Sequence, residues 1–489
     1  MDKIEIYSKD EAYVKIECER GTAMELSDYF TFSVPGAKFM PAYRNKMWDG
    51  KIRLFNMNSR ALYKGLVSRV RQFCEERDYE LIVHDGVEDT NNISLPELYQ
   101  FLSDLKYKPR DYQLRAIAHA LRNNRALILS PTASGKSFII YCILKYLLEV
   151  AGCRKALLVV PTVSLVEQMD TDFLEYSSEH STVNDTLKIT AGQEKSSPTA
   201  RVFISTWQSI YKMPPAWFSQ FDVVIGDEAH LFKADSLTKI MTKMDGCKYR
   251  FGLTGTLDDT LTNQLVLEGL FGPVMRVIHT KELIENKTLA DFRIKCLVLK
   301  YPEQVCKQNV KMAYKDEINF LITNERRNKF IKNLTVSREG NTLLLFQMVD
   351  KHGKVLYNLI KDAVDENRRV FFVHGGVDAA DREEIRAITE KETNAIIVAS
   401  YGTFSTGINI RNLHNVIFAS PSKSRVRTLQ SIGRGLRKGD NKSSATLYDI
   451  ADNLSHKSYN NHTLKHFAVR IKMYNEEEFQ YKLYNIKVG

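Results

Sequence analysis

Residues Ala126-Leu-Ile-Leu-Ser-Pro-Thr-Ala-Ser-Gly-Lys-Ser-Phe-Ile-Ile-Tyr141 join three short patterns in the middle of the chain. An apolar run at 126–129 is followed by a turn of small residues and then by an apolar helical pattern at 138–148. Strand, turn and helix in this order are the context in which the pattern G-x-x-x-x-G-K-[ST] holds nucleotide phosphates. Backbone amides of the turn and the positive end of the helix can bind phosphate oxygens. The stretch therefore predicts a phosphate-binding loop within an α/β domain.

The residues of this loop have distinct expected roles. Ser130 takes the place of the first glycine of the pattern, and its side chain leaves the backbone less free to approach phosphate than glycine would. Lys136 is expected to reach the β- and γ-phosphates, and the Ser137 hydroxyl is expected to ligate Mg²⁺. The full set of nucleotide contacts expected from the loop is Pro131, Thr132, Ala133, Ser134, Gly135, Lys136 and Ser137.

An acidic pair follows a second apolar run. Asp227-Glu-Ala-His230 comes directly after Asp222-Val-Val-Ile-Gly226, a pattern typical of a buried strand. Both carboxylates should then project from the carboxyl edge of the sheet, where ligands bind in open α/β folds. We expect Asp227 to hold Mg²⁺ through water and Glu228 to position and deprotonate the attacking water, an effect worth about 10²- to 10⁴-fold. Together with the loop, this pair predicts hydrolysis of a nucleoside triphosphate.

The chain of 489 residues has an ordinary globular composition, with 44% hydrophobic and 26% charged residues. Its formal net charge of +10 suits a polyanionic partner, although a solvated basic surface would give the same charge. The seven cysteines are scattered without a C-x-x-C pair, which favours reduced thiols and gives no zinc pattern. No signal-like segment or membrane-spanning apolar run is evident, so we expect a cytoplasmic protein without a membrane partner.

Apolar runs alternate with helical stretches in two sets, the first ending near residue 270 and the second beginning near residue 343. Continuous apolar strands between helices indicate parallel sheets covered on both faces. The expected fold class is α/β, with two tandem doubly wound parallel-sheet domains and a small N-terminal α+β domain. The expected boundaries are 1–105 for the N-terminal domain, 106–280 and 281–455 for the α/β domains, and 456–489 for a basic tail packing on the second of them.

The N-terminal region between 38 and 71 is strongly basic, and Asp49 is its single acidic residue. Aromatic residues are interleaved with the basic ones, a pattern that suits unpaired or junction bases in nucleic acid. A solvated basic face over an aromatic core is the alternative interpretation. The residues expected to contact nucleic acid in this region are Arg44, Lys46, Trp48, Lys51 and Arg53.

The order of the motifs resembles that of superfamily 2 helicases. Besides the loop and the acidic tetrad, the matching stretches are Arg110-Asp-Tyr-Gln113, Val160-Pro-Thr162, Ser205-Thr-Trp-Gln208, Leu253-Thr-Gly-Thr256, Leu345-Phe-Gln347, Ser400-Tyr-Gly-Thr-Phe-Ser-Thr-Gly-Ile408 and Gln430-Ser-Ile-Gly-Arg-Gly-Leu-Arg437. The resemblance covers roughly residues 108–440 and implies that both α/β domains are RecA-like.

The resemblance implies roles for further residues. Gln113 matches the residue that reads the adenine edge, so ATP is the expected nucleotide. Arg437 matches the arginine finger and Arg434 a second phosphate-facing arginine, contributions worth about 10³- to 10⁵-fold in phosphoryl transfer. Thr254 and Thr256 match the motif that couples the nucleotide and nucleic-acid sites, with His230 as a partner. The positions matching contacts to the nucleic-acid backbone are Thr162, Thr206, Gln347 and Thr406.

A narrower resemblance comes from the N-terminal region. Tyr43-Arg-Asn-Lys-Met-Trp-Asp-Gly-Lys-Ile-Arg-Leu54 is similar to the Y-R-x-x-x-W-D-G-x-I-R-L stretch of the UvsW-type recombination and repair helicases of T4-like bacteriophages. That family remodels branched DNA by unwinding forks and D-loops, migrating Holliday junctions and annealing strands. The resemblance implies an ATP- and Mg²⁺-dependent DNA helicase of phage recombination, repair and replication. Its expected partners are forked or branched DNA, single-stranded DNA and R-loops, and we expect it to act as a monomer.

Three other functions stay open on the sequence alone. An RNA helicase would use the same pair of α/β domains and would be stimulated by RNA. A non-enzymatic junction-binding or annealing protein would not need the intact Lys136, Glu228 and Arg437. The motor subunit of a restriction enzyme would need a nuclease partner, because no nuclease pattern is evident in this chain. No long insertion between the two α/β sets supplies an obvious strand-separating pin.

Overall fold

The computed structural model describes residues 2–34, 36–131, 134–177, 181–232, 234–257, 261–403, 410, 412–420, 424, 428–429, 431–433 and 444–488. By its internal contacts the chain forms two units. The first contains residues 1–130 and 135–277, and the second contains residues 131–134 and 278–489.

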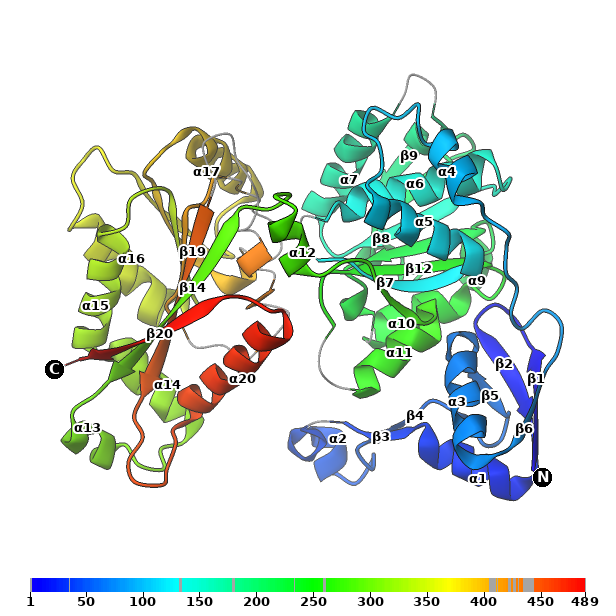
Figure 1. Cartoon of the computed structure of the whole chain (residues 1–489), viewed down its shortest axis with the longest axis horizontal. Coiled ribbons are helices and arrows are strands. Elements are labelled where there is room, and N and C mark those ends of the chain that lie inside the picture. The colour runs from blue at the N-terminus through cyan, green and yellow to red at the C-terminus, as the bar shows by residue number, and fades with distance from the viewer. Residues whose placement is uncertain are drawn as a thin grey trace. The chain divides into compact units, whose positions relative to one another are not determined.

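A four-stranded mixed sheet begins the first unit (Figure 1). Its strand order is β5-β2-β1-β6, in which β1 pairs antiparallel with β2 and parallel with β6. Alternate side chains of β1 and β2, including Ile4, Ile6, Val14 and Ile16, are fully buried, as expected for a sheet with one face on a core. The elements are β1 (Lys3–Ser8), β2 (Tyr13–Glu17), β5 (Ala61–Tyr63), β6 (Glu80–Val83), α1 (Arg20–Tyr29) and α3 (Val67–Arg77).

A separate two-stranded ribbon extends from this small domain. Strands β3 (Thr31–Ser33) and β4 (Lys51–Arg53) pair antiparallel, and the segment between them forms the 3₁₀ turn η1 (Ala37–Phe39) and the short helix α2 (Pro41–Arg44). We call residues 31–53 the arm. In Figure 1 the helix α2 lies at the far end of the ribbon, away from the four-stranded sheet of its own domain.

A seven-stranded parallel sheet forms the larger part of the first unit. Its order is β13-β7-β12-β11-β8-β10-β9, and every residue of β7, β8, β10 and β11 is buried. Apolar strands without alternation are therefore buried on both faces, as the sequence predicts. The strands are β7 (Arg125–Leu129), β8 (Ala156–Val160), β9 (Thr186–Ile189), β10 (Val202–Thr206), β11 (Val223–Asp227), β12 (Tyr249–Thr254) and β13 (Val274–Arg276).

Helices of 4 to 14 residues precede and connect these strands. They are α4 (Leu95–Phe101), α5 (Asp111–Asn123), α6 (Lys136–Glu149), α7 (Val163–Tyr176), α8 (Trp207–Ile210), α9 (Pro215–Phe218), α10 (Asp235–Lys243) and α11 (Leu261–Phe271). Helix α6 follows the phosphate-binding loop, is strongly apolar and is buried along most of its length. A helix buried nearly all round belongs to the interior of a layered α/β domain.

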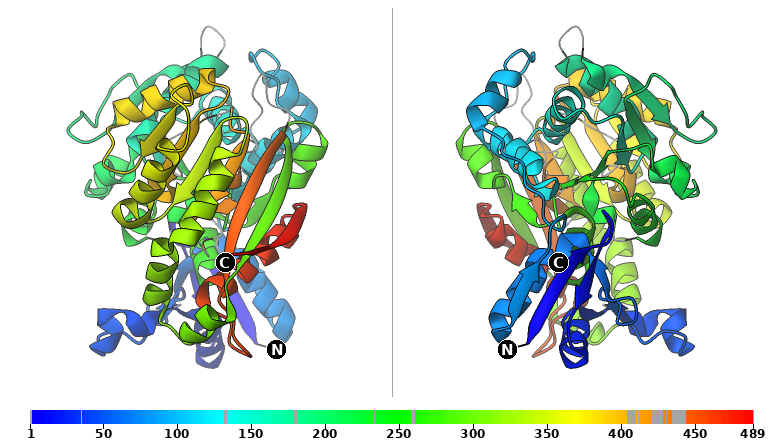
Figure 2. Two further views of the ribbon diagram at one scale, coloured as in Figure 1. Left: turned by 90° about the vertical axis from the view of Figure 1, so that its left-hand side faces the viewer. Right: turned by 90° about the vertical axis from the view of Figure 1, so that its right-hand side faces the viewer.

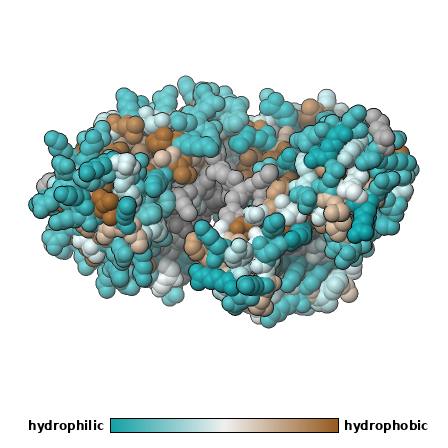
Figure 3. All heavy atoms as spheres, turned by 90° about the horizontal axis from the view of Figure 1, so that it is seen from below, coloured by the Kyte–Doolittle hydropathy of each residue, from teal (hydrophilic) through white to brown (hydrophobic). Residues whose placement is uncertain are grey.

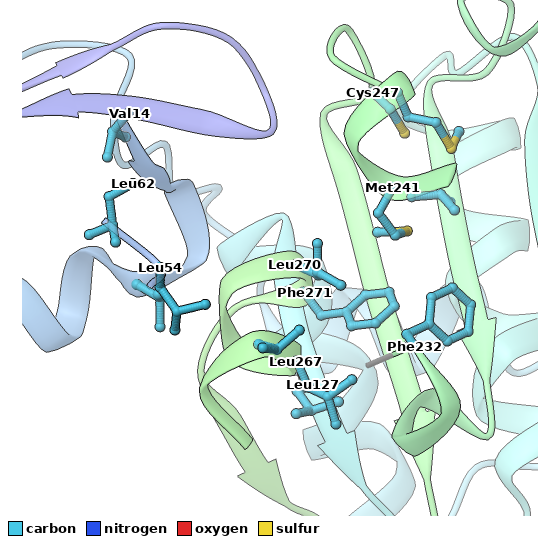
Figure 4. Packing of buried hydrophobic residues seen from close by; sticks show 14 of the residues in the cluster. Val14, Leu54, Leu62, Leu127, Phe232, Met241, Cys247, Leu267, Leu270 and Phe271 are labelled. Carbon is cyan, nitrogen blue, oxygen red and sulfur yellow. The ribbon is translucent and has the colours of Figure 1, made fainter. Parts of the chain in front are cut away.

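One hydrophobic core extends through the first unit, from the small domain into the seven-stranded sheet (Figure 4). Phe232 and Phe271 meet edge to face, with ring centroids 5.1 Å apart. Glycines in two adjacent strands make room for these rings. A Cβ at Gly226 would lie 2.6 Å from the Phe232 ring, and one at Gly252 would lie 2.8 Å from the Phe271 ring.

The second unit contains another seven-stranded parallel sheet, in the order β16-β17-β15-β18-β19-β14-β20. In Figure 1, α15 (Glu325–Val336) and α16 (Lys354–Lys361) lie on one side of these strands and α20 (His462–Glu476) on the other. The strands are β14 (Asp291–Lys300), β15 (Thr342–Phe346), β16 (Val370–Val373), β17 (Ile396–Ser400), β18 (Asn415–Phe418), β19 (Ser444–Asn453) and β20 (Tyr481–Lys487), and the remaining helices are α12 (Thr280–Glu285), α13 (Glu303–Gln308), α14 (Tyr314–Thr323) and α17 (Ala379–Lys391).

These two parallel sheets and the small mixed-sheet domain confirm the expected fold class. The boundaries expected at 105, 280 and 455 stay predictions. The C-terminal residues take part in the second sheet, because β20 pairs with β14 from Ile294↔Tyr481 to Lys300↔Lys487. The side views in Figure 2 show the ends of β14, β19 and β20 near the C-terminus.

Two buried ion pairs connect helices of the second unit to strand β19 of its sheet. Arg327 on α15 pairs with Asp452 on β19 at 2.8 Å, and both side chains are fully buried. Arg470 on α20 pairs with Asp449 on β19 at 2.8 Å, and the Tyr474 hydroxyl donates to the same carboxylate. Charged groups without water must be paired, so these contacts fix the two helices against β19.

Hydrophilic residues dominate the face seen in Figure 3, and hydrophobic residues appear there in small separate groups. Among the described residues, no helix combines the length and the apolar character needed to cross a bilayer.

Candidate active site

The phosphate-binding loop begins where β7 ends. Ser130 is fully buried, and its N–H donates to the Thr254 carbonyl of the neighbouring strand β12 at 2.9 Å. The hydroxyl of Ser134 donates to the Pro131 carbonyl at 2.5 Å, which closes the loop across its middle. Thr132 and Ala133, two of the expected nucleotide contacts, lie outside the described residues.

Gly135 turns the loop into α6 and has a left-handed backbone, with φ of +84°. A Cβ at this position would lie 2.4 Å from Nε2 of Gln113. The left-handed backbone favours glycine at this position, and a larger residue would also displace the Gln113 amide. The loop and the residue expected to read adenine are thus brought together.

Gln113 is held by the start of α5. Its Oε1 accepts the N–H of Arg110 at 2.9 Å in a capping box, and the side chain is buried. The guanidinium of Arg110 donates to the Tyr112 hydroxyl at 3.1 Å. A glutamine at the third position of a helix commonly caps it in this way. The hydrogen bond from Arg110 therefore holds the Gln113 side-chain amide in place next to Gly135.

Lys136 and Ser137 form the first turn of α6, and both are half-buried. The Ser137 hydroxyl shares a hydrogen bond with the Tyr176 hydroxyl at 2.9 Å, at the last residue of α7. Burial raises the pKa of Tyr176 to about 12, so its phenol keeps its proton at neutral pH. The Tyr176 ring also packs edge to face on Phe138, with centroids 5.2 Å apart. The expected Mg²⁺ ligand is thus oriented by a residue that no sequence pattern identified.

Asp227 is the last residue of β11, and its side chain is buried. Burial, and secondly the neighbouring Glu228 carboxylate, raise the pKa of Asp227 to about 7, while the Lys136 charge acts in the opposite direction. Among the described residues, the Oδ1 atom of Asp227 has no hydrogen-bond partner. Such a carboxylate is stabilised by a cation placed beside it.

Glu228 has a left-handed backbone, with φ of +50°. Its Oε2 lies 3.4 Å from Nδ1 of His230, and the same Nδ1 lies 3.0 Å from the Thr254 hydroxyl. The Thr254 hydroxyl donates to the Thr256 carbonyl at 2.9 Å. A chain of contacts therefore connects the expected catalytic base to the Leu253-Thr-Gly-Thr256 motif. A left-handed glutamate is uncommon and holds the side chain in a defined direction.

The described residues fit a nucleotide with its divalent cation. The loop places a glycine where a side chain would collide, a lysine and a serine at the first turn of a helix, and a buried carboxylate oxygen without a partner nearby in the same unit. A helix start binds phosphate, and hydroxyl and carboxylate oxygens are ligands that Mg²⁺ prefers.

The residues expected to contact the nucleic-acid backbone are held at the ends of elements. Thr162 caps α7, and its Oγ1 accepts the N–H of Leu165 at 3.3 Å, so the hydroxyl proton remains to donate to a phosphate. Thr206 is buried, and its Oγ1 lies 2.9 Å from the Ser209 hydroxyl. Gln347 follows β15 in the second unit and is exposed. Thr406, Arg434 and Arg437 lie outside the described residues.

The five expected contacts of the N-terminal region all lie on the arm. Arg44, Lys46 and Lys51 are exposed. Trp48 is half-buried, and its indole N–H donates to the Lys51 carbonyl at 2.8 Å, so it also supports the turn. Arg53 pairs with Asp49 at 2.5 Å. The structure therefore brings these residues together on one projecting segment.

Family models match three parts of the chain. Residues 3–84 match the family described as DNA helicase UvsW, N-terminal; residues 106–259 match Type III restriction enzyme, res subunit; and residues 325–439 match the Helicase conserved C-terminal domain. The matches follow the order of the small domain and the two α/β domains.

Similar proteins extend the match to the whole chain. The ATP-dependent DNA helicase uvsW of Enterobacteria phage T4 is 34% identical over 99% of this chain and 100% of its own length. The crystal structure of T4 UvsW aligns with 100% of both chains at a TM-score of 0.53 and 33% identity. A DNA 3'-5' translocase XPB2 of Sulfurisphaera tokodaii is 23% identical over 76% of this chain and 86% of its own length.

Proposed function

The chain belongs to the family of the UvsW-type ATP-dependent DNA helicases, and we propose on this basis that it remodels branched DNA in phage recombination, repair and replication. The observation that supports this best is the site itself. The first unit brings Lys136 and Ser137 together with the buried carboxylate of Asp227, and Glu228 follows in a fixed conformation. This arrangement supports hydrolysis of ATP rather than a protein that only binds junctions.

We propose the following roles for the residues of the site. The amides of the loop and the amino group of Lys136 hold the phosphates, and Ser137 and Asp227 hold the ion, the latter through water. When bound, Mg²⁺ neutralises the charge that develops on the transferred phosphoryl group. Glu228 accepts the proton of the attacking water, and His230 keeps its carboxylate in place from 3.4 Å away. Gln113 recognises the adenine, which makes ATP the nucleotide.

We propose that hydrolysis is coupled to DNA through the chain from Glu228 to Thr256. His230 contacts both Glu228 and Thr254. A shift of the threonine motif would therefore change the position of the proposed catalytic base through His230. Arg434 and Arg437 are proposed as the phosphate-facing arginines of the second unit. The proposed grip on the DNA backbone comes from Thr162, Thr206, Gln347 and Thr406.

The proposed substrates are forked and branched DNA, single strands and R-loops, bound by a monomer in the host cytoplasm. The arm supports the branched-DNA part of this proposal, because basic residues are exposed on it beside aromatic ones. Light scattering of the purified protein with and without forked DNA tests the monomer. A stable dimer in both states would overturn it.

The test of the proposed function is ATP hydrolysis by the wild type and by Glu228→Gln, with forked DNA, linear duplex, single strands and RNA supplied separately. We expect the strongest stimulation from forked DNA and its loss in Glu228→Gln, by about 10²-fold or more. Lys136→Ala should also abolish DNA-stimulated hydrolysis. Equal or greater stimulation by RNA would instead identify an RNA helicase, and unchanged hydrolysis in both variants would overturn the assignment of the site.

A further inference from the structure

The tip of the arm exposes large apolar side chains in one short segment. Every residue from 38 to 47 is exposed. Met47 is 81% exposed, Phe39 66%, Met40 46% and Tyr43 42%. Single exposed apolar residues are ordinary on protein surfaces, whereas a group of them indicates a surface that meets a partner.

The tip is held in one conformation by its own contacts. Gly50 has φ of +77°, and a Cβ there would lie 2.9 Å from Cβ of Ala37 and 3.0 Å from the Tyr43 ring. The N–H of Met47 donates to the Ala42 carbonyl at 2.9 Å, and Trp48 bonds to the Lys51 carbonyl. These contacts keep Phe39 and Met47 on a folded tip, so their exposure is a feature of an ordered element.

The ribbon carries this tip away from the rest of its domain. The β3–β4 pairing runs from Thr31↔Arg53 to Ser33↔Lys51, and beyond it the Val34 N–H donates to the Gly50 carbonyl at 2.8 Å. In Figures 1 and 2 the end of the arm projects from the small domain that contains α1 and α3. A short ribbon with a compact end makes the side chains at its tip accessible to a partner molecule.

Charge on the arm defines the chemistry of the partner. Lys38, Arg44 and Lys46 lie among the apolar residues of the tip, and residues 38–47 contain no acidic side chain. Asp49, the nearest acid, is paired with Arg53. Apolar groups surrounded by cations suit a ligand that has both phosphates and flat apolar faces, which nucleic acid offers where its bases are unstacked.

We propose that the arm tip is a wedge for DNA branch points, in which Phe39 and Met47 insert against the bases at the junction while Lys38, Arg44 and Lys46 hold the flanking phosphates. This inference rests on the proposed function and names the part of the chain that separates the strands. Apolar side chains inserted at a base step unstack it in many DNA-bending proteins. The motor would then drive the duplex against the wedge.

The test uses the full-length protein and a DNA fork with 2-aminopurine at the branch point, a base whose fluorescence rises when it is unstacked. Without nucleotide, wild type should raise this fluorescence, and the double variant Phe39→Ser/Met47→Ser should not. The same variant should unwind forks about tenfold more slowly, as the loss of one stacked contact implies. Met24→Ser removes a similarly exposed methionine from α1, outside the arm, and should behave as wild type.

Hydrolysis stimulated by single-stranded DNA separates the wedge from the proposed function. If single strands and forks fail to stimulate wild type, the proposed function is wrong. If they stimulate wild type and the double variant alike, and the variant still unstacks and unwinds the fork as wild type does, the wedge is wrong. Phe39→Trp/Met47→Leu should restore both signals, which a merely misfolded tip would not allow. Binding to phosphatidylglycerol vesicles that depends on Phe39 and Met47, with fork unwinding unaffected, would identify a membrane contact and overturn the wedge.

Discussion

At the scale of single residues, the hydrogen bond between Ser137 and Tyr176 supports a residue of the candidate nucleotide site from outside that site. The Tyr176 hydroxyl lies at the end of α7, whose first residue follows the capping Thr162. One helix therefore carries an expected DNA contact at one end and a partner of the expected Mg²⁺ ligand at the other. Groups that orient a metal ligand affect metal affinity even though they do not touch the metal.

Tyr176→Phe should weaken the apparent affinity for Mg²⁺ in ATP hydrolysis. The change removes one hydrogen bond, worth about 0.5–1.5 kcal/mol or roughly 2- to 12-fold in affinity, and leaves the ring packing intact. Titrating MgCl₂ at saturating ATP and DNA measures it, and we expect the maximal rate to change little. Tyr107→Phe is the matched control, because the Tyr107 hydroxyl bonds Glu175 at 2.5 Å beside the same helix end. An identical Mg²⁺ dependence in wild type and Tyr176→Phe would contradict the positioning role.

His352 gives the second unit a pH-dependent stability. Burial, and secondly the nearby positive charge of Arg327, lower the pKa of His352 from 6.5 to about 3. Its stabilising contribution is fully present above pH 6.5 and is lost as the pH falls toward 3, because only the unfolded chain then takes up the proton. From pH 8 to pH 5 this amounts to about 2 kcal/mol of unfolding free energy.

Urea unfolding of wild type and His352→Gln at pH 8 and pH 5 measures this effect. Other groups titrate in both proteins, so the comparison is the difference between their pH dependences. We expect wild type to lose about 2 kcal/mol more than the variant on acidification. Equal losses would mean that His352 is protonated in the folded protein.

The sequence predicted the members of the candidate site that lie in short contiguous patterns, because the loop and the acidic tetrad each need their chemistry at fixed spacing. It could not identify Tyr176, whose partner Ser137 is distant in sequence and whose type is common at helix ends. It also could not show that Trp48 bonds the Lys51 carbonyl, or that Thr206 is buried against Ser209. Those facts depend on side-chain directions set by tertiary packing.

At the scale of elements, β19 is the strand that organises the second unit. It carries Asp449 and Asp452, which pair with α20 and α15 respectively, and it lies between β18 and β14. The Tyr301 hydroxyl adds a third contact, 2.8 Å from Asp452. A buried carboxylate that accepts several hydrogen bonds satisfies each of its donors, so losing the carboxylate leaves all of them without that partner.

Asp452→Asn should destabilise the second unit by about 3–5 kcal/mol, because it leaves the buried guanidinium of Arg327 without its countercharge. Asp291→Asn is the control, since Asp291 pairs with Arg293 on the exposed surface and should cost at most about 1 kcal/mol. Chemical denaturation measures both. The double variant Arg327→Met/Asp452→Leu should recover most of the loss, and a failure of Asp452→Asn to destabilise would show that the pair is dispensable.

The elements that sequence patterns predicted well are the strands with continuous apolar runs, since short apolar runs between helical stretches are typical of buried parallel strands. The patterns did not single out β14 or β20. In β14 the first half alternates between exposed and buried residues, and β20 is largely exposed at the edge of its sheet. At the sheet edge β20 has faces that meet water, which removes the apolar signal. Strand β14 lies inside the sheet, but the exposed residues of its first half interrupt the apolar run.

At the scale of the whole molecule, the small domain is joined to the seven-stranded-sheet domain of the first unit by ion pairs of partly buried side chains. Glu11 pairs with Lys64 at 3.1 Å and also with Arg125 at the start of β7. Arg69 on α3 pairs with the buried Glu268 on α11 at 2.8 Å. The arm therefore belongs to a domain that is attached to the first α/β domain by ion pairs and a shared hydrophobic core, as a wedge would require if force is to reach the branch point.

At Gly65 the backbone of the small domain closely approaches the backbone of helix α11. A Cβ at Gly65 would lie 2.1 Å from the Glu268 carbonyl and 2.7 Å from the Gly269 carbonyl, both backbone atoms that cannot turn aside. Gly65→Ala should therefore cost about 1–3 kcal/mol or more in the stability of the first unit and loosen the small domain. Gly21→Ala is the control, because nothing lies within 4 Å of its Cβ on helix α1 and alanine favours a helix.

Thermal unfolding followed by limited proteolysis distinguishes the outcomes of Gly65→Ala. If the small domain transmits force to the wedge, the variant should lose fork unwinding while single-stranded DNA still stimulates its ATP hydrolysis, and protease should cut between the small domain and β7. Gly21→Ala should match wild type in fork unwinding, ATP hydrolysis and resistance to protease, and its thermal stability should be equal or slightly higher. Fork unwinding at the wild-type rate by a Gly65→Ala protein whose small domain is released by protease would show that the motor separates strands without a fixed N-terminal domain.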